Sequence, residues 1–84
     1  MYVILAYDIK DDKIRDKVRE LLRKYLNHVQ KSVFEGYIDK KVLDHIVFEV
    51  LRMINTDDRI LIIILDYKNF KKITLGKKVK ENII

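Results

Sequence analysis

Apolar residues follow two different periods along the chain, and together these predict a mixed α and β domain. Residues 2–7 form a short run of β-branched, aromatic and aliphatic side chains, typical of a buried strand. Between Ile14 and Tyr25 apolar residues recur at helical spacing, with most basic residues outside the stripe. A second, broader apolar stripe from Val42 to Ile54 predicts a second helix.

The remaining segments have the composition of strands. Residues 28–38 predict one bent strand or two short strands around Lys31 and Ser32, where Gly36 allows a bulge or a close backbone approach. Residues 59–67 are the strongest strand prediction, and their centre is apolar on both faces, as expected for a central strand. Residues 70–75 predict a shorter strand that ends at Gly76.

This order of elements predicts an α+β fold in one domain, residues 1–84. If the middle segment is two strands, the order is that of a ferredoxin-like βαββαβ sandwich, with two helices on one face of an antiparallel sheet. Residues 76–84 would form a tail or an extra C-terminal strand. Because strand side chains alternate between faces, Tyr2, Ile4, Phe34 and Ile62 cannot all point at the helices. The uncovered face leads us to expect a twofold homodimer.

Composition narrows the kinds of site available. The chain has 84 residues and no cysteine, which excludes disulfides and thiolate-bound zinc. His28 and His45 are too isolated for a histidine-rich metal cluster. The apolar run from Ile60 to Leu65 is too short to span a bilayer, and no signal peptide is visible, so we expect a soluble, cytoplasmic protein with no membrane association.

The charge favours a polyanionic partner. The formal net charge is +5, and residues 67–80 contain six lysines and no acidic residue. Such a field favours nucleic acid, although a lysine-rich solvated surface gives the same composition. No nucleophilic triad, phosphate-binding glycine loop or zinc-ligand spacing is present in the sequence.

One carboxylate stands at a strand-to-helix junction. Asp8 directly follows the first predicted strand, and Asp11 or Asp12 is placed to cap the following helix, as Asp39 is for the second helix. Two interpretations of Asp8 are open from the residues alone. It is either a turn residue hydrogen-bonded to the start of the helix, or a ligand for a metal ion.

Three stretches carry a resemblance to a known family. They are YVILAYDI at residues 2–9, DKIRDKVRELLRKYL at 12–26 and VQKSVFEGYI at 29–38, of which Val29 to Gly36 is the most specific. Together they resemble Cas2, the small CRISPR-associated protein that partners the integrase in spacer acquisition. In architecture the resemblance extends over essentially the whole chain.

The resemblance implies a function. It implies a homodimer whose sheets face each other, acting as a metal-dependent endonuclease on phosphodiester bonds of RNA or double-stranded DNA, with Mg²⁺ or Mn²⁺, in spacer acquisition for antiviral defence. The alternative is a non-catalytic DNA-binding scaffold that bridges dimers of the CRISPR integrase subunit. The family's C-terminal strand commonly crosses to the partner's sheet, a role available to the segment after Gly76.

The resemblance also assigns residues. Asp8 is the implied metal ligand, shared with its copy in the partner subunit because a single carboxylate is a poor Mg²⁺ site. Arg15 and Phe34 join Asp8 as candidate catalytic residues. The candidates for nucleic-acid binding are Tyr7, Arg15, Lys17, Lys31, Ser32, Lys77 and Lys78.

Alternatives stay open for several of these residues. Arg15 and Lys17 are two residues apart on a helix and do not share a face, so we expect only one, Arg15, to reach the cleft. Phe34 could stack on a base, but a core position would explain it without any functional role. His28 stands where some family members carry arginine, which predicts a weaker phosphate contact there.

Overall fold

The computed structural model describes residues 1–65. Residues that the sequence predicts as a strand at 70–75, the tail after Gly76, and the candidate nucleic-acid ligands Lys77 and Lys78 lie outside the described residues. The described elements are β1 Tyr2–Asp8, α1 Asp12–Arg23, β2 Asn27–Gln30, β3 Val33–Tyr37, α2 Lys40–Met53 and β4 Arg59–Leu65.

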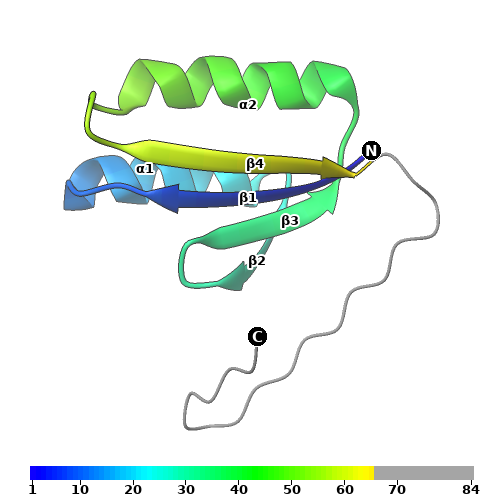
Figure 1. Cartoon of the computed structure of the whole chain (residues 1–84), viewed down its shortest axis with the longest axis horizontal. Helices are drawn as coiled ribbons and strands as arrows, with labels where there is room; N and C mark the ends of the chain where they lie inside the picture. Colours follow the sequence, from blue (N-terminus) through cyan, green and yellow to red (C-terminus); the bar gives the residue numbers. More distant parts are fainter. Residues whose placement is uncertain (66–84) are drawn as a thin grey trace, which may run out of the picture.

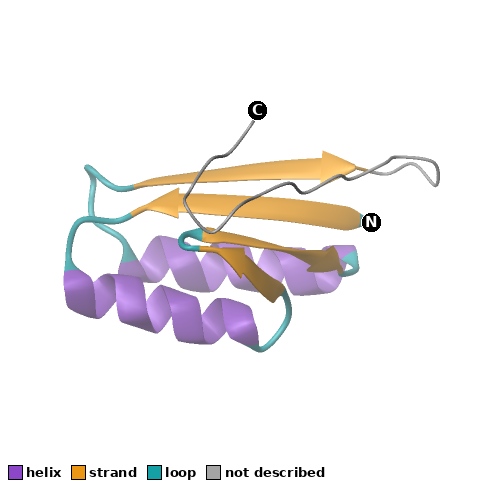
Figure 2. Cartoon of the chain, turned by 90° about the horizontal axis from the view of Figure 1, so that it is seen from below, coloured by secondary structure: helices purple, strands orange, loops and turns teal. Residues whose placement is uncertain are grey.

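The four strands form one antiparallel sheet in the order β2-β3-β1-β4. Both helices lie on the same face of this sheet, and the other face is turned away from them (Figures 1 and 2). This arrangement confirms the predicted ferredoxin-like α+β sandwich. Neither helix of the described part has the length and apolar run needed to cross a membrane.

The middle segment is two strands that turn at Lys31 and Ser32. The irregularity in their pairing lies between His28 and Gln30 and not at Gly36. Gly36 instead serves a close approach, because a Cβ built there would stand 3.2 Å from the Leu26 side chain. Glycine is therefore used here for space between β3 and the turn that follows α1.

The prediction that β4 is a central strand is wrong for the described sheet. There β4 lies at the edge and pairs with β1, while β1 and β3 occupy the inner positions. The strand is apolar on both faces for a different reason. Ile60 and Ile62 pack against the core under the helices, whereas Leu61 and Ile63 are exposed on the opposite face.

Helix starts follow the predicted chemistry. The Asp11 side chain accepts a hydrogen bond from the Ile14 backbone N–H at 3.0 Å, and Asp39 accepts one from Val42 at 2.9 Å. These bonds satisfy backbone donors that the first helical turn leaves without partners. The two helices then bury one apolar stripe each against the odd-numbered side chains of β1. The fully buried members of this core are Val3, Leu5, Val18, Leu22, Phe34 and Ile46.

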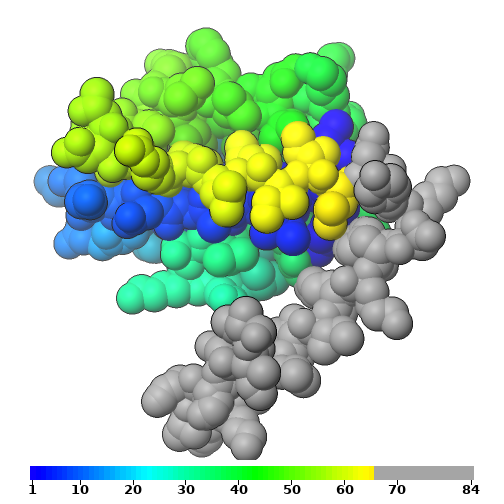
Figure 3. All heavy atoms as spheres, in the orientation of Figure 1, coloured from blue at the N-terminus to red at the C-terminus, as the bar shows by residue number. Residues whose placement is uncertain are grey.

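The sheet face turned away from the helices, which we call the outer face, carries a row of apolar side chains. The pairing register aligns Ile4 with Ile63 and Ala6 with Leu61 on this face. Leu61 is 59% exposed and Ile63 is 43% exposed. Figure 3 looks onto this face, and the atoms of β4 (yellow) are at the front of the molecule. Tyr2 and Ile4 therefore face away from the helices while Phe34 and Ile62 face them, as strand alternation predicts.

Candidate functional site

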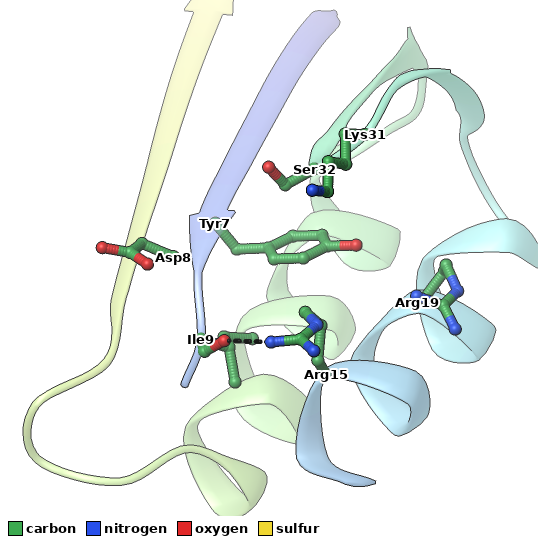
Figure 4. Close-up of a pocket in the computed structure, with 7 residues that line it drawn as sticks. All are labelled: Tyr7, Asp8, Ile9, Arg15, Arg19, Lys31 and Ser32. Atoms are coloured by element: carbon green, nitrogen blue, oxygen red, sulfur yellow. Dashed lines mark hydrogen bonds between the residues drawn. The ribbon is translucent and has the colours of Figure 1, made fainter. Parts of the chain in front are cut away.

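A pocket of about 370 Å³ opens beside the C-terminal end of β1, and we call it the cationic pocket. Its walls come from the end of β1, from one side of α1 and from the turn between β2 and β3 (Figure 4). The lining residues are Tyr7, Asp8, Ile9, Arg15, Arg19, Lys31 and Ser32. Four of the predicted nucleic-acid ligands are thus brought together from three separate segments.

Asp8 is exposed at the last position of β1. Because successive strand side chains alternate, Tyr7 points to the helix side of the sheet and Asp8 to the outer face. Figure 4 shows the Asp8 carboxylate on the opposite side of the strand from the Tyr7 ring. The structure therefore separates Asp8 from the basic side chains of the cationic pocket, although the backbone brings them to the same end of β1.

The turn interpretation of Asp8 is wrong. The bond to the start of α1 is made by Asp11, three residues further on. Within the described part of the chain, the Asp8 carboxylate takes part in no hydrogen bond and no ion pair. An exposed carboxylate without a partner is available to an external ligand.

Arg15 is held in place by its own segment. Its Nη1 donates a hydrogen bond to the Ile9 carbonyl oxygen at 2.8 Å, and its Nη2 pairs with the Asp12 carboxylate. These contacts set the guanidinium beside the cationic pocket while leaving further N–H donors for a ligand. Lys17 lies elsewhere, in a groove between the two helices with Glu20 and His45. As the helical spacing predicts, only Arg15 of the two reaches the pocket.

Arg19 is a pocket residue that the sequence interpretation missed. It lies one helical turn beyond Arg15, on the same face of α1, and lines the cationic pocket. Its side chain is 29% exposed and pairs with Asp16. The signal that could have identified it is the four-residue spacing from Arg15, which places the two residues on the same face of α1.

Of the two interpretations of Phe34, the core position is confirmed, because its side chain is 0% exposed and offers no surface on which a base could stack. The Phe34 ring lies between two others. Its centroid is 6.3 Å from that of Tyr7 and 4.3 Å from that of His28, whose ring is nearly parallel to it. His28 therefore covers the core, and its Nε2 lies 3.2 Å from the Lys31 carbonyl oxygen.

A core role for Phe34 makes a testable prediction. Replacing Phe34 with Leu removes buried aromatic area and should lower the free energy of unfolding by about 1–2 kcal/mol. Phe48→Leu is the matched control, because Phe48 is 60% exposed on α2 and should leave stability nearly unchanged. Urea unfolding followed by circular dichroism measures both. Unchanged stability for Phe34→Leu, together with lost nucleic-acid binding, would return Phe34 to a ligand-contacting role.

Arg59 is a second residue that the sequence interpretation missed. The register places Arg59 directly opposite Asp8 across the β1–β4 pair, and both residues are exposed on the outer face. Together with Ala6 and Leu61 they line a shallow hollow of about 360 Å³ at the end of that face. Asp8 therefore lies at the margin of the apolar outer face, with a basic residue beside it.

Asp8 is not part of a larger cluster of potential metal ligands within residues 1–65. No group of three or more His, Cys, Asp or Glu side chains in this part of the chain is arranged to hold a metal ion. One protomer supplies one carboxylate at this position, and Mg²⁺ is usually bound through one or two carboxylates together with waters and substrate phosphates.

Comparison with known proteins identifies the family. The model of the family described as CRISPR associated protein Cas2 matches residues 1–73, which is most of the chain. The chain belongs to the Cas2 family. This confirms the resemblance carried by the residues from Tyr2 to Ile38.

Individual Cas2 relatives agree with this assignment. A protein of Methanocaldococcus jannaschii named CRISPR-associated endoribonuclease Cas2 is 43% identical over 75% of this chain, and the match spans 54% of that relative's length. A Nanoarchaeum equitans protein of the same name is 39% identical over 92% of this chain and 86% of its own. A crystal structure of a Cas2 protein superposes with a TM-score of 0.82 at 36% identity, covering 100% of this chain and 97% of the other.

Proposed function

We propose that the protein is a metal-dependent endonuclease that hydrolyses phosphodiester bonds of RNA or double-stranded DNA during CRISPR spacer acquisition. The observation that carries this proposal is the exposed Asp8 carboxylate, which has no hydrogen-bond or ion-pair partner within residues 1–65 and lies at the margin of an exposed apolar sheet face. The names of the Cas2 relatives, which are CRISPR-associated endoribonucleases, support RNA as the first substrate to test.

The proposal includes a homodimer that packs outer face to outer face. Leu61 and Ile63 expose apolar area there that a soluble protein gains by burying, and Ala6 and Ile4 continue the same surface. A twofold contact brings the same patch of both copies together. Asp8 is in line with this apolar row on β1, so each copy would contribute one carboxylate at the edge of the interface.

Two copies of Asp8 would hold one Mg²⁺ or Mn²⁺ ion, for which carboxylate oxygens are suitable ligands. When bound, such an ion neutralises charge on the phosphoryl group and makes an attacking water more acidic. The chain's own residues do the rest. Arg59, which the register sets opposite Asp8, would bind a phosphate oxygen, and the basic side chains of the cationic pocket would hold the strand on the other side of β1.

A second function, the DNA-binding scaffold between integrase dimers, is favoured by one observation. The cationic pocket lies on the opposite side of β1 from the Asp8 carboxylate, so the backbone-binding residues do not depend on the metal ligand. Phosphate contacts of this kind give affinity without sequence preference. A protein that binds nucleic acid in the absence of metal and never cuts it would have this function alone.

Removing the metal tests the proposal. Labelled RNA and duplex DNA are incubated with the protein in Mg²⁺ or in excess EDTA, and cleavage and binding are measured in parallel. We expect cleavage only with Mg²⁺ and restored when Mg²⁺ is added back, while binding persists in EDTA. Binding without cleavage under any metal condition would reject the nuclease and leave the scaffold.

A further inference from the structure

The Tyr7 hydroxyl is a buried polar group with no partner among the described residues. Tyr7 as a whole is 6% exposed, yet its hydroxyl oxygen makes no hydrogen bond in that part of the chain. Leaving such a group unsatisfied costs about 1–3 kcal/mol, so native proteins seldom do it without a reason. The aromatic ring packs on Phe34 and does not explain why the position carries tyrosine in place of phenylalanine.

The surroundings of that hydroxyl are those of an anion site. Tyr7 lines the cationic pocket, and Figure 4 shows its hydroxyl end among Arg15, Arg19, Lys31 and Ser32. All of these side chains can donate hydrogen bonds and three carry positive charge. The Asp8 carboxylate points away from the pocket, and the carboxylates paired with Arg15 and Arg19, on Asp12 and Asp16, are exposed and not among the lining residues.

We propose that the cationic pocket is a phosphate-binding subsite, with Tyr7 and Arg19 as its specificity-determining residues. The proposal rests on the proposed function only for the source of the phosphate, which is a nucleic-acid strand bound beside Asp8. The Tyr7 hydroxyl and the two guanidinium groups donate to the phosphate oxygens. The subsite is complete within one protomer, so it needs neither the metal ion nor the partner subunit.

Phosphate is the anion that the pocket favours. The N–H groups of a single guanidinium match the spacing of two phosphate oxygens, and a hydroxyl and an ammonium group supply further donors. Apart from Ile9 and the ring of Tyr7, the lining side chains are polar, so the pocket offers little surface on which a base could stack. Contacts to phosphates position a strand without reading its sequence.

Two substitutions and one matched control test the subsite. Tyr7→Phe removes only the unpartnered hydroxyl and should not impair folding. Arg19→Gln removes one charge from the pocket, and Arg23→Gln makes the same change one turn further along α1, at an exposed position that does not line it. All three are made with Asp8→Asn, and binding is measured in EDTA so that no cleavage interferes.

The first measurement is the binding of inorganic phosphate. It is monitored by the NMR chemical shifts of the backbone amides of Tyr7, Arg19 and Ser32. The second uses the dissociation constant of a labelled 12-nucleotide RNA. Because each variant loses a hydrogen bond to a charged ligand, Tyr7→Phe and Arg19→Gln should each raise the dissociation constants for phosphate and for RNA by about tenfold. Arg23→Gln should change the dissociation constant for RNA by about twofold or less. If both pocket variants bind phosphate and RNA as Arg23→Gln does, the subsite is rejected.

Comparing RNA that carries a 5′-phosphate with RNA that carries a 5′-hydroxyl identifies which phosphate the subsite binds. Equal losses for RNA with a 5′-phosphate and a 5′-hydroxyl support the subsite and assign it to internal phosphodiesters. Losses confined to the 5′-phosphate RNA support the subsite and assign it to a strand end. The outcome is separable from nuclease activity, because phosphate shifts at Tyr7 that Tyr7→Phe abolishes would establish the subsite even if no RNA is ever cut.

Discussion

Replacing Asp8 with Asn is expected to abolish metal-dependent cleavage, lowering its rate by about a hundredfold or more. The amide is nearly isosteric but removes the negative charge, and in a dimer it removes both copies at once. Folding and nucleic-acid binding should persist, because Asp8 makes no hydrogen bond or ion pair within the described residues and the basic pocket side chains lie on the other side of β1. Initial rates on labelled RNA and duplex DNA in Mg²⁺ measure the loss.

Asp11→Asn is the matched control for this experiment. It makes the same chemical change three residues away, and asparagine caps a helix about as well as aspartate, so the bond to Ile14 is retained. This variant should cut at the wild-type rate. Equal cutting by the two variants would remove Asp8 from the reaction and would point to a contaminating nuclease. A wild-type protein that binds but does not cut would leave the scaffold function.

Replacing Leu61 with Asp is expected to dissociate the proposed dimer. A carboxylate placed in an apolar interface without a partner costs several kcal/mol, so the dimer dissociation constant should rise on the order of a hundredfold or more. Because Asp8 is in line with the same apolar row, the monomer should also lose metal-dependent cleavage. Light scattering coupled to size-exclusion chromatography gives the mass, and circular dichroism checks that the monomer is folded.

Leu51→Asp is the control for the interface. Leu51 is 65% exposed and Leu61 is 59% exposed, but Leu51 lies on α2, on the side of the molecule opposite the outer face. We expect Leu51→Asp to remain dimeric and active. A dimer that survives Leu61→Asp, or one that Leu51→Asp dissociates, would move the interface away from the outer face. An active Leu61→Asp monomer would overturn the shared use of Asp8.

Local interactions explain which features the sequence predicted well. The helical stripes, the caps at Asp11 and Asp39, and the strand from Tyr2 depend on residues within four positions of one another, so their period and chemistry are visible in the chain. The separation of Arg15 from Lys17 follows from helical geometry alone. The residues alone left the role of Asp8 open between a turn residue and a metal ligand. The family resemblance favoured the metal ligand.

The site could be predicted only in part, because its parts come from different segments. Arg19 was missed although its spacing from Arg15 was visible, since nothing in the sequence shows which side of α1 faces the turn at Lys31 and Ser32. Phe34 belongs to a motif that suggests function, yet His28 and Tyr7 enclose its ring from neighbouring strands. Arg59 comes beside Asp8 only through the pairing of β4 with β1.

The sequence by itself determined the two helices, the first strand and the α+β class, because periodicity and capping act over a few residues, and it left residues 28–38 open between one strand and two. Tertiary structure decided the strand order that puts β4 at the edge of the described sheet, and the side of β1 on which each functional group lies. Tyr7 and Asp8 are adjacent in sequence, so their side chains point to opposite faces of β1. Because the helices cover one face, the Tyr7 hydroxyl lies at the cationic pocket and the Asp8 carboxylate lies on the outer face. That division depends on which face of the sheet the helices cover, which only the packed fold specifies.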